Sequence, residues 1–139
     1  EEVVSPEGEG VESFSPEIVS EVVGMERYFE LIRKGMLEVV QGKRGTARKV
    51  RIEGVQIAGK TGTAQVVRVA QYRGMREEDI PYKWRDHAWF TCFAPADNPE
   101  IAVTVLVEHG LHGGSGAGPI ARAVLKEYFG DRLNQAIQE

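Results

Sequence analysis

Lys60, Thr61, Gly62 and Thr63 are the residues of this sequence whose types and spacing point most clearly to chemistry. They lie in a stretch rich in β-branched residues, which favours a strand. The lysine cation and the two threonine hydroxyls are groups suited to a terminal carboxylate. A glycine has no Cβ, so a second backbone can come close to it. A strand with this sequence beside a cleft could align an extended peptide and, through an amide near Thr63, help to bind an oxyanion. The alternative is an ordinary strand whose polar side chains face water.

The same residues complete a second pattern, in which Gly54 is followed after four residues by Gly59, Lys60 and Thr61. This is the pattern of a P-loop, whose backbone amides cradle phosphates at the start of a helix. The four intervening residues, Val-Gln-Ile-Ala, have a strand pattern, and the residues after Lys60 continue it. The context therefore favours the peptide-binding interpretation. A nucleotide-binding protein and a non-catalytic binding module stay as the alternatives.

Several separated blocks of the sequence support the first interpretation. They are, in order, GTARKV, GKTGTAQVV, DHAWFTCFAPADNPEIAVTVLVEHG and GGSGAGPIARAVLKEYF. Lys-Thr-Gly is one of three signatures of serine β-lactamases and penicillin-binding proteins. Over roughly residues 25–130 the chain resembles the C-terminal part of the transpeptidase domain of class B penicillin-binding proteins. The resemblance is greatest to the elongation-specific type, penicillin-binding protein 2.

The resemblance implies a role for each residue of the motif. Lys60, Thr61, Gly62 and Thr63 would form the strand that flanks the active site. The Lys60 amine would join the catalytic hydrogen-bond network, and the Thr61 and Thr63 hydroxyls would hold the carboxylate of D-alanine or of a β-lactam. The backbone N–H of Thr63 would be an oxyanion-hole donor, and Ala64 would belong to the substrate-binding strand.

The resemblance also implies the activity of the larger protein. Such an enzyme cross-links peptidoglycan stem peptides by serine acyl transfer at their D-Ala-D-Ala ends, and β-lactams mimic that end. It needs neither a cofactor nor a metal. It works on the outer, periplasmic face of the bacterial inner membrane, beside an elongation-complex glycosyltransferase, and is held by an anchor that this sequence does not contain.

Two of the three family signatures are missing from these 139 residues. The family's nucleophile lies in S-x-x-K and its second serine in S-x-N, and no serine here has Lys three positions later or Asn two positions later. The five serines are Ser5, Ser13, Ser15, Ser20 and Ser115. The nearest imitation, Thr46-Ala-Arg-Lys49, is expected to be a turn. Covalent catalysis requires a nucleophile beside its base, so we expect an inactive C-terminal fragment that depends on a missing N-terminal part.

A few other side chains invite functional interpretations. His87, His109, His112 and Cys92 could be combined into a zinc site, but the spacing His109-x-x-His112 suits a metal only with further ligands. We expect no metal here, and a buried, hydrophobic role for Cys92. The Asp86-His87 pair is expected to be structural.

The glycine-rich loop and the tryptophans also have competing interpretations. The loop over residues 113–118 could bind an anion at a helix start, but a flexible rim beside the cleft is the expectation. Trp89 should pack within its strand, whereas the sequence leaves the roles of Trp84 and of the three histidines open.

The elements that must position the motif follow from hydrophobic periodicity. Residues 1–24 are acidic and rich in Pro and Gly, which predicts an extended connection. Residues 25–42 show helical spacing and end at Gly42. The range 50–109 predicts strands: strand, turn and strand up to the motif, a polar excursion at 68–86, and a hairpin from two apolar runs. Residues 118–130 predict a helix that ends at Gly130, with Ile120, Val124, Leu125 and Tyr128 on its apolar side. The predicted fold is α+β, an antiparallel sheet flanked by helices.

Composition sets the outer limits of this interpretation. A chain of 139 residues with 42% hydrophobic residues suits one core. The net charge of −4 does not favour nucleic acid as a partner. No apolar run reaches the ~20 residues of a membrane span, and one cysteine cannot form an intrachain disulfide. Residues 31–60 carry eight basic residues, which we expect to form a solvated face.

Overall fold

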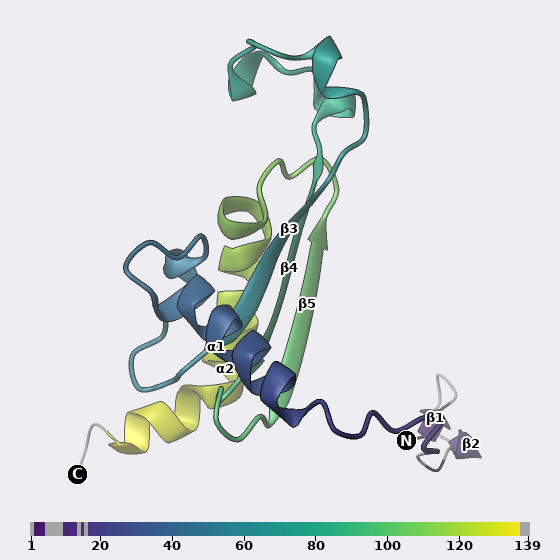
Figure 1. Ribbon diagram of the computed structural model, residues 1–139, viewed down its shortest axis with the longest axis vertical. Coiled ribbons are helices and arrows are strands. Elements are labelled where there is room, and N and C mark those ends of the chain that lie inside the picture. Colours follow the sequence, from purple (N-terminus) through teal and green to yellow (C-terminus); the bar gives the residue numbers. More distant parts are fainter. Residues whose placement is uncertain (1, 5–9, 14, 16, 137–139) are drawn as a thin grey trace.

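A three-stranded antiparallel sheet lies at the centre of this computed structural model, which describes residues 2–4, 10–13, 15 and 17–136. The strands are β3 (Ala58–Ala64), β4 (His87–Ala94) and β5 (Ile101–Val107), in the order β3-β4-β5. The predicted hairpin is therefore confirmed as β4 and β5. Figure 1 shows helices α1 and α2 beside this sheet, so the α+β fold is confirmed as well.

Alternation along β4 explains which face of the sheet is buried. Ala88, Phe90, Cys92 and Ala94 are buried, whereas Trp89 and the other side chains between them are exposed or half-buried. Successive strand residues point to opposite faces, so one face of β4 forms the core. Trp89 lies in its predicted strand, but on the other face, where it stays 40% exposed.

Helix α2 (Gly118–Ala136) covers the buried face of the sheet, and it corrects two expectations. Ala121, Leu125 and Phe129, one helical turn apart, are buried in the core. The expected apolar side was wrong in most of its members, because Ile120, Val124 and Tyr128 are exposed. The helix also continues past Gly130, since one glycine costs a helix only about 1 kcal/mol relative to Ala.

Helix α1 (Glu26–Gln41) agrees with the predicted helix at 25–42. Arg51 closes its C-terminal end, because the guanidinium donates to the carbonyl oxygens of Val40, Gln41 and Gly42 at 2.7–2.9 Å. These carbonyls have no partner within the helix. Val40 is the one residue of α1 that is buried, so most of the apolar side predicted from the periodicity stays exposed.

Two stretches predicted as simple extended segments have a different structure. The segment before the motif forms a 3₁₀ turn, η1 (Arg48–Val50), and a single bridge from Ile52 to Val55, rather than a strand. Its β-branched residues are buried as the chain turns at Gly54, where φ is +78°. The strand propensity of such residues reflects how well their side chains pack on a buried surface more than a preference of the backbone, so burial without a strand also satisfies them. The turn expected for residues 46–49 is confirmed.

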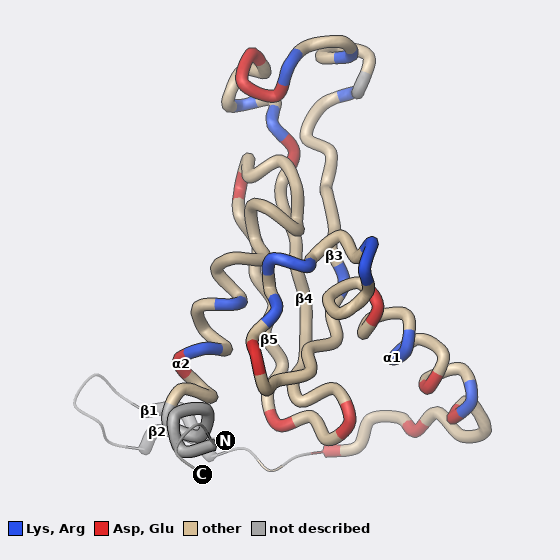
Figure 2. Tube along the Cα trace, turned by 90° about the vertical axis from the view of Figure 1, so that its left-hand side faces the viewer, with Lys and Arg blue, Asp and Glu red and all other residues tan. Residues whose placement is uncertain are grey.

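Part of the predicted N-terminal connection is strand. β1 (Glu2–Val4) pairs antiparallel with β2 (Gly10–Ser13), whereas residues 17–23 have neither helix nor strand. Residues 1, 5–9, 14 and 16 of that predicted connection lie outside the described residues. Figure 2 shows acidic residues along the segment that leads into α1.

The excursion at 68–86 is confirmed as a region without long elements. It contains three 3₁₀ turns, η2 (Val69–Gln71), η3 (Glu77–Asp79) and η4 (Tyr82–Trp84), and projects beyond the ends of β3 and β4 (Figure 1). Asp86 holds its base, accepting hydrogen bonds from the Val66 N–H and the Tyr72 hydroxyl. Desolvation, and after it the hydrogen bond and charge of Asp86, raise the pKa of Tyr72. The structural role expected for Asp86 fits these contacts.

None of the helices in the described ranges has the length and apolar character that crossing a bilayer requires.

Candidate functional site

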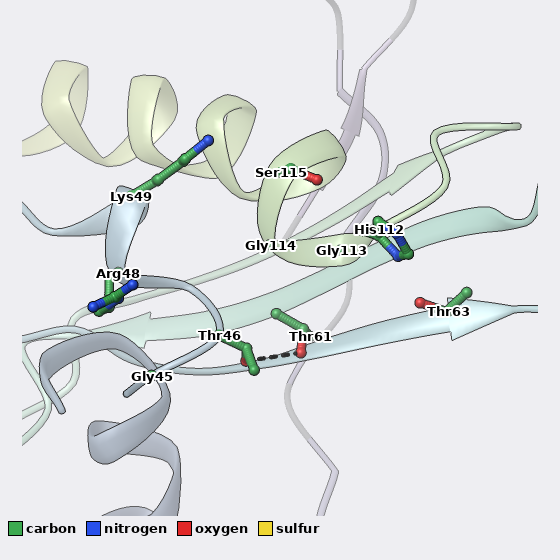
Figure 3. A pocket seen from close by; sticks show the side chains of 10 residues that line it. All are labelled: Gly45, Thr46, Arg48, Lys49, Thr61, Thr63, His112, Gly113, Gly114 and Ser115. Atoms are coloured by element: carbon green, nitrogen blue, oxygen red, sulfur yellow. Dashed lines mark hydrogen bonds between the residues drawn. The ribbon is translucent and has the colours of Figure 1, made fainter. Parts of the chain in front are cut away.

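A pocket of about 370 Å³ lies where three segments meet: the turn after α1, strand β3 and the loop before α2 (Figure 3). Its lining residues are Gly45, Thr46, Arg48, Lys49, Thr61, Thr63, His112, Gly113, Gly114 and Ser115. The volume falls in the range of small-molecule sites. The lining combines hydroxyl groups with basic side chains and contains no Asp or Glu.

Thr61 and Thr63 are the two motif residues that the structure brings into this pocket. They are alternate residues of β3, so their side chains share one face of the strand. The hydroxyl oxygens of Thr61 and Thr46 lie 3.2 Å apart and share a hydrogen bond. The turn after α1 therefore fixes the hydroxyl of Thr61 in the pocket.

Lys60 lies on the opposite face of β3 and does not line the pocket. Its Nζ is exposed and donates a 2.6 Å hydrogen bond to the carbonyl oxygen of Thr61. Its neighbour across the sheet is Thr91, which is exposed on that same outer face. The strand thus separates the lysine of the motif from its two hydroxyls, and alternation alone could have predicted this.

Gly62 is tightly packed against the protein itself. A Cβ at Gly62 would lie 3.1 Å from Cβ of Trp89, and a Cβ at Gly113 would lie 2.1 Å from the carbonyl oxygen of Trp89 and 2.8 Å from that of Gly62. The loop before α2 therefore crosses the sheet at these glycines. On the face where Gly62 lacks a Cβ the nearest atoms belong to the Trp89 side chain, so the approach of a substrate backbone at Gly62 stays a prediction.

That loop forms a rim of the pocket, as expected, but it is packed down rather than free-standing. Residues 113–117 make one π-helical turn, η5 (Gly113–Ala117), in which Gly113 and Ala117 are buried. Gly114 and Ser115 face the pocket from this turn (Figure 3).

β3 is an edge strand of the sheet, and helix α1 packs against part of it. In the described part of the chain β3 pairs with β4 alone, in a register that sets Lys60 opposite Thr91. An extended peptide can add to such an edge through its main chain. The edge and the pocket together offer main-chain groups, hydroxyls and positive charge to one ligand.

The P-loop alternative is wrong. Residues 56 and 57 lead directly into β3, and both Lys60 and Thr61 lie within that strand. Strand continues to Ala64 where a phosphate-binding loop requires a helix N-terminus.

Comparison with known families decides among the remaining interpretations. The family model of the penicillin-binding protein transpeptidase domain matches residues 6–126. This chain belongs to the penicillin-binding protein transpeptidase domain family. The resemblance on which the sequence interpretation depends is thereby confirmed.

Two relatives of this chain carry the same name, peptidoglycan D,D-transpeptidase MrdA. Peptidoglycan D,D-transpeptidase MrdA of Haemophilus influenzae is 40% identical over 108 residues, which are 77% of this chain and 17% of that protein. MrdA of Acinetobacter baumannii is 46% identical over 107 residues, with 77% and 16% covered.

Solved structures give the same picture. The structure of Pseudomonas aeruginosa PBP2 in complex with WCK 5153 has a TM-score of 0.61 at 38% identity and covers 78% of this chain and 20% of that one. PBP2 of Helicobacter pylori in complex with MreC has a TM-score of 0.63 at 36% identity, with 78% and 18% covered. The chain spans a fifth or less of the length of these relatives.

The histidines of this transpeptidase chain hold the excursion to the pocket rim. The His112 Nε2 lies 2.7 Å from a carboxylate oxygen of Glu77 in the excursion. The His109 Nδ1 donates to the carbonyl of Arg85 at 2.8 Å, and the His109 backbone N–H donates to Nδ1 of His87 at 2.9 Å. Within the described ranges, no group of three or more His, Cys, Asp or Glu is arranged for a metal ion. Trp84, half-buried, lies in the same excursion.

Sequence reasoning missed several members of the pocket. The sequence predicts a turn without a function at Thr46, Arg48 and Lys49, and it offers His112 only as a metal ligand. Their common signal is weak, because residues 46–49, 61–63 and 112–115 are far apart along the chain. The GTARKV block, which carries part of the family resemblance, was the one available pointer.

Cys92 is the buried hydrophobe that was expected, with 2% of its surface exposed beneath α2. Burial raises the pKa of its thiol to about 11, and a backbone hydrogen bond with Val103 opposes only part of that rise. The thiolate is the reactive form, so about 100-fold less of it is present at pH 8 than for a thiol of pKa about 9.

We expect alkylation of Cys92 by iodoacetamide at pH 8 to be about 100-fold slower in native than in urea-denatured protein, read by peptide mass spectrometry. Equal rates would contradict the burial of Cys92.

Proposed function

We propose that this chain is the substrate-binding part of a peptidoglycan D,D-transpeptidase, carrying the strand that aligns the stem peptide. The observation that carries the proposal is the placement of Thr61 and Thr63 in one pocket on an edge strand. Membership of the transpeptidase family, and the D,D-transpeptidases among its relatives, support it.

In the proposed reaction a serine from outside these residues attacks the carbonyl of the penultimate D-Ala. The tetrahedral intermediate collapses, the C–N bond breaks, and terminal D-Ala leaves with the proton that the serine lost. An amine of a second stem peptide then attacks the acyl-enzyme. The C–N bond of the cross-link forms, the ester bond to the serine breaks, and the proton of the amine returns to the serine oxygen. β-Lactams take the place of the D-Ala-D-Ala end and stay attached to the serine.

The residues of this chain bind and orient the substrate in that reaction. The Thr61 and Thr63 hydroxyls donate to the terminal carboxylate, because a carboxylate only accepts hydrogen bonds. The edge of β3, up to Ala64, pairs with the extended peptide, and the Thr63 N–H stabilises the developing oxyanion. The Lys60 amine contributes to the proton-transfer network on the outer face of β3, where the missing signatures would have to lie.

Exposed apolar side chains on α1 and just before it form a surface on which the rest of the parent protein could pack. Tyr28, Leu31 and Ile32 on α1 are more than half exposed, as are Ile18 and Val19 before it. Large apolar side chains in such numbers favour burial against another surface. We propose that the N-terminal part of the same protein packs there and supplies the nucleophile.

The setting of the parent is proposed from its relatives. The structure of H. pylori PBP2 in complex with MreC supports an MreC-like protein as a partner of the parent. An elongation-complex glycosyltransferase is the neighbouring enzyme that the family resemblance implies. The parent would be anchored in the inner membrane, with this domain on the periplasmic side.

The proposed function is tested by labelling with a fluorescent penicillin. The parent protein is expected to give a covalent band, whereas the 139 residues alone give none, because they lack S-x-x-K. A parent that stays unlabelled, or a labelled 139-residue chain, would overturn the proposal.

A further inference from the structure

Positive charge in the pocket comes from an unexpected source. The motif offers Lys60 as the cation for a carboxylate, but Lys60 is on the outer face of β3 with its ammonium on the Thr61 carbonyl. Arg48 and Lys49, from the turn after α1, are the basic residues that line the pocket together with His112. Figure 3 shows Arg48 and Lys49 at one end of the pocket and His112 near Thr63 at the other, with Thr46 and Thr61 between.

The two basic side chains differ in how far they are already engaged. One guanidinium nitrogen of Arg48 donates to the Lys43 carbonyl at 2.7 Å, which anchors that side chain. For Lys49, no hydrogen bond or ion pair is recorded within the described residues, and the side chain is exposed. Arg48 is thus a fixed charge, whereas Lys49 is free to meet a ligand.

In the described part of the chain no ion pair to Arg48 or Lys49 is found, although Glu38 lines the neighbouring pocket together with Gly45 and Thr46. The pocket lining contains no Asp or Glu. Glu77 approaches the lining from the excursion, but its carboxylate contacts His112 at 2.7 Å, at the Thr63 end. An anion in the pocket therefore meets hydroxyls along β3 and the positive charges of Arg48 and Lys49 at the end away from Thr63.

We infer that Lys49, supported by Arg48, is a specificity-determining residue that selects substrates with a free terminal carboxylate. The inference deepens the proposed function and rests on it. The threonine hydroxyls supply directional hydrogen bonds, and the cations supply the attraction that distinguishes a carboxylate from a neutral end. Hydrogen bonds with an ionised donor or acceptor are about twice as strong as those between neutral groups. Lys60 is thereby left to the reaction itself.

The test uses the parent protein and two β-lactams that differ only at the carboxylate, a penicillin and its carboxamide. In the unmodified parent the second-order acylation rate should be much higher for the acid than for the amide. Lys49→Gln is expected to lower the rate for the acid about tenfold and to change the rate for the amide less than twofold. The salt dependence of the acid's rate should also weaken, because screening acts on the lost attraction.

Two variants control for structural effects. Lys49→Arg should restore the preference for the acid, since it restores the charge. Lys43→Gln removes a charge from the same turn, but its side chain is outside the pocket, so it should leave both rates unchanged.

Each outcome has one meaning. Loss of the preference in Lys49→Gln with rescue by Lys49→Arg supports the inference. An unchanged preference in Lys49→Gln, or an equal loss for acid and amide, overturns it while leaving the proposed function intact. A parent that neither β-lactam acylates overturns the proposed function itself.

Discussion

Thr61→Val in the parent protein is expected to slow acylation by penicillin 10- to 100-fold. Valine keeps the shape and strand preference of threonine but removes the hydroxyl that would hold the carboxylate. A hydrogen bond to a charged group is worth about 1.5–3 kcal/mol, which corresponds to that range. The substitution also leaves the Thr46 hydroxyl without its recorded partner. Thr61→Val combined with Thr63→Val should slow acylation further.

Thr104→Val is the matched control for this prediction. Thr104 is exposed in the same sheet, but on the outer face, where its hydroxyl pairs with that of Thr91 at 2.8 Å. Its loss should change the acylation rate less than twofold. If stopped-flow acylation shows the same rate for Thr61→Val as for the unmodified parent, the assignment of the pocket to the carboxylate is wrong.

Lys60→Ala should also lower the acylation rate by at least about tenfold, because it removes a proton-transfer group rather than a carboxylate contact.

Gly113→Ala is expected to destabilise the protein by at least about 2 kcal/mol, because overpacking against atoms that cannot move away is costly. The new Cβ would lie 2.1 Å from the Trp89 carbonyl oxygen and 2.8 Å from that of Gly62. Both are backbone atoms of the sheet, so the loop before α2 has to lift. Because Gly114 and Ser115 line the pocket from this loop, penicillin acylation should fall together with the melting temperature.

Gly35→Ala provides the opposite result with the same change of residue. Gly35 lies inside α1, and a Cβ there would have no atom within 4 Å. Alanine favours a helix over glycine by about 1 kcal/mol, so this variant should melt slightly higher. If Gly113→Ala is as stable as Gly35→Ala, the loop before α2 does not cross the sheet at Gly62 and Gly113.

Local pattern predicted the elements whose neighbours in space are also neighbours in sequence. The β4–β5 hairpin follows from two apolar runs joined by a short turn, and α1 from its periodicity and Gly42. The excursion was evident from the absence of any period. In these cases the signal and the structure are both local.

Features that depend on tertiary packing were not predictable in this way. In α2 the residues that pack are Ala121, Leu125 and Phe129, yet the larger Ile120 and Val124 made the neighbouring stripe look more apolar. Packing against the sheet decides which stripe of the helix is buried, and hydrophobicity alone does not predict that choice. The pairing of β1 with β2 was missed for a related reason, since its strands are only three and four residues long.

In the candidate site, too, some residues follow from local sequence pattern and others only from tertiary packing. Thr61 and Thr63 were identified from the motif, and strand alternation places them together. Thr46, Arg48 and Lys49 reach them only because the chain turns back after α1. The cations that line the pocket, Arg48 and Lys49, are therefore different residues from Lys60, the lysine of the motif.

The most direct test of the account is to find which serine penicillin acylates in the parent protein. Peptide mapping by mass spectrometry after penicillin treatment should place the covalent adduct on a serine outside residues 1–139, followed three positions later by lysine. Thr61→Val should reduce the yield of that same peptide. An adduct on Ser115, the serine of this pocket, would contradict the account, because the chain would then carry its own nucleophile.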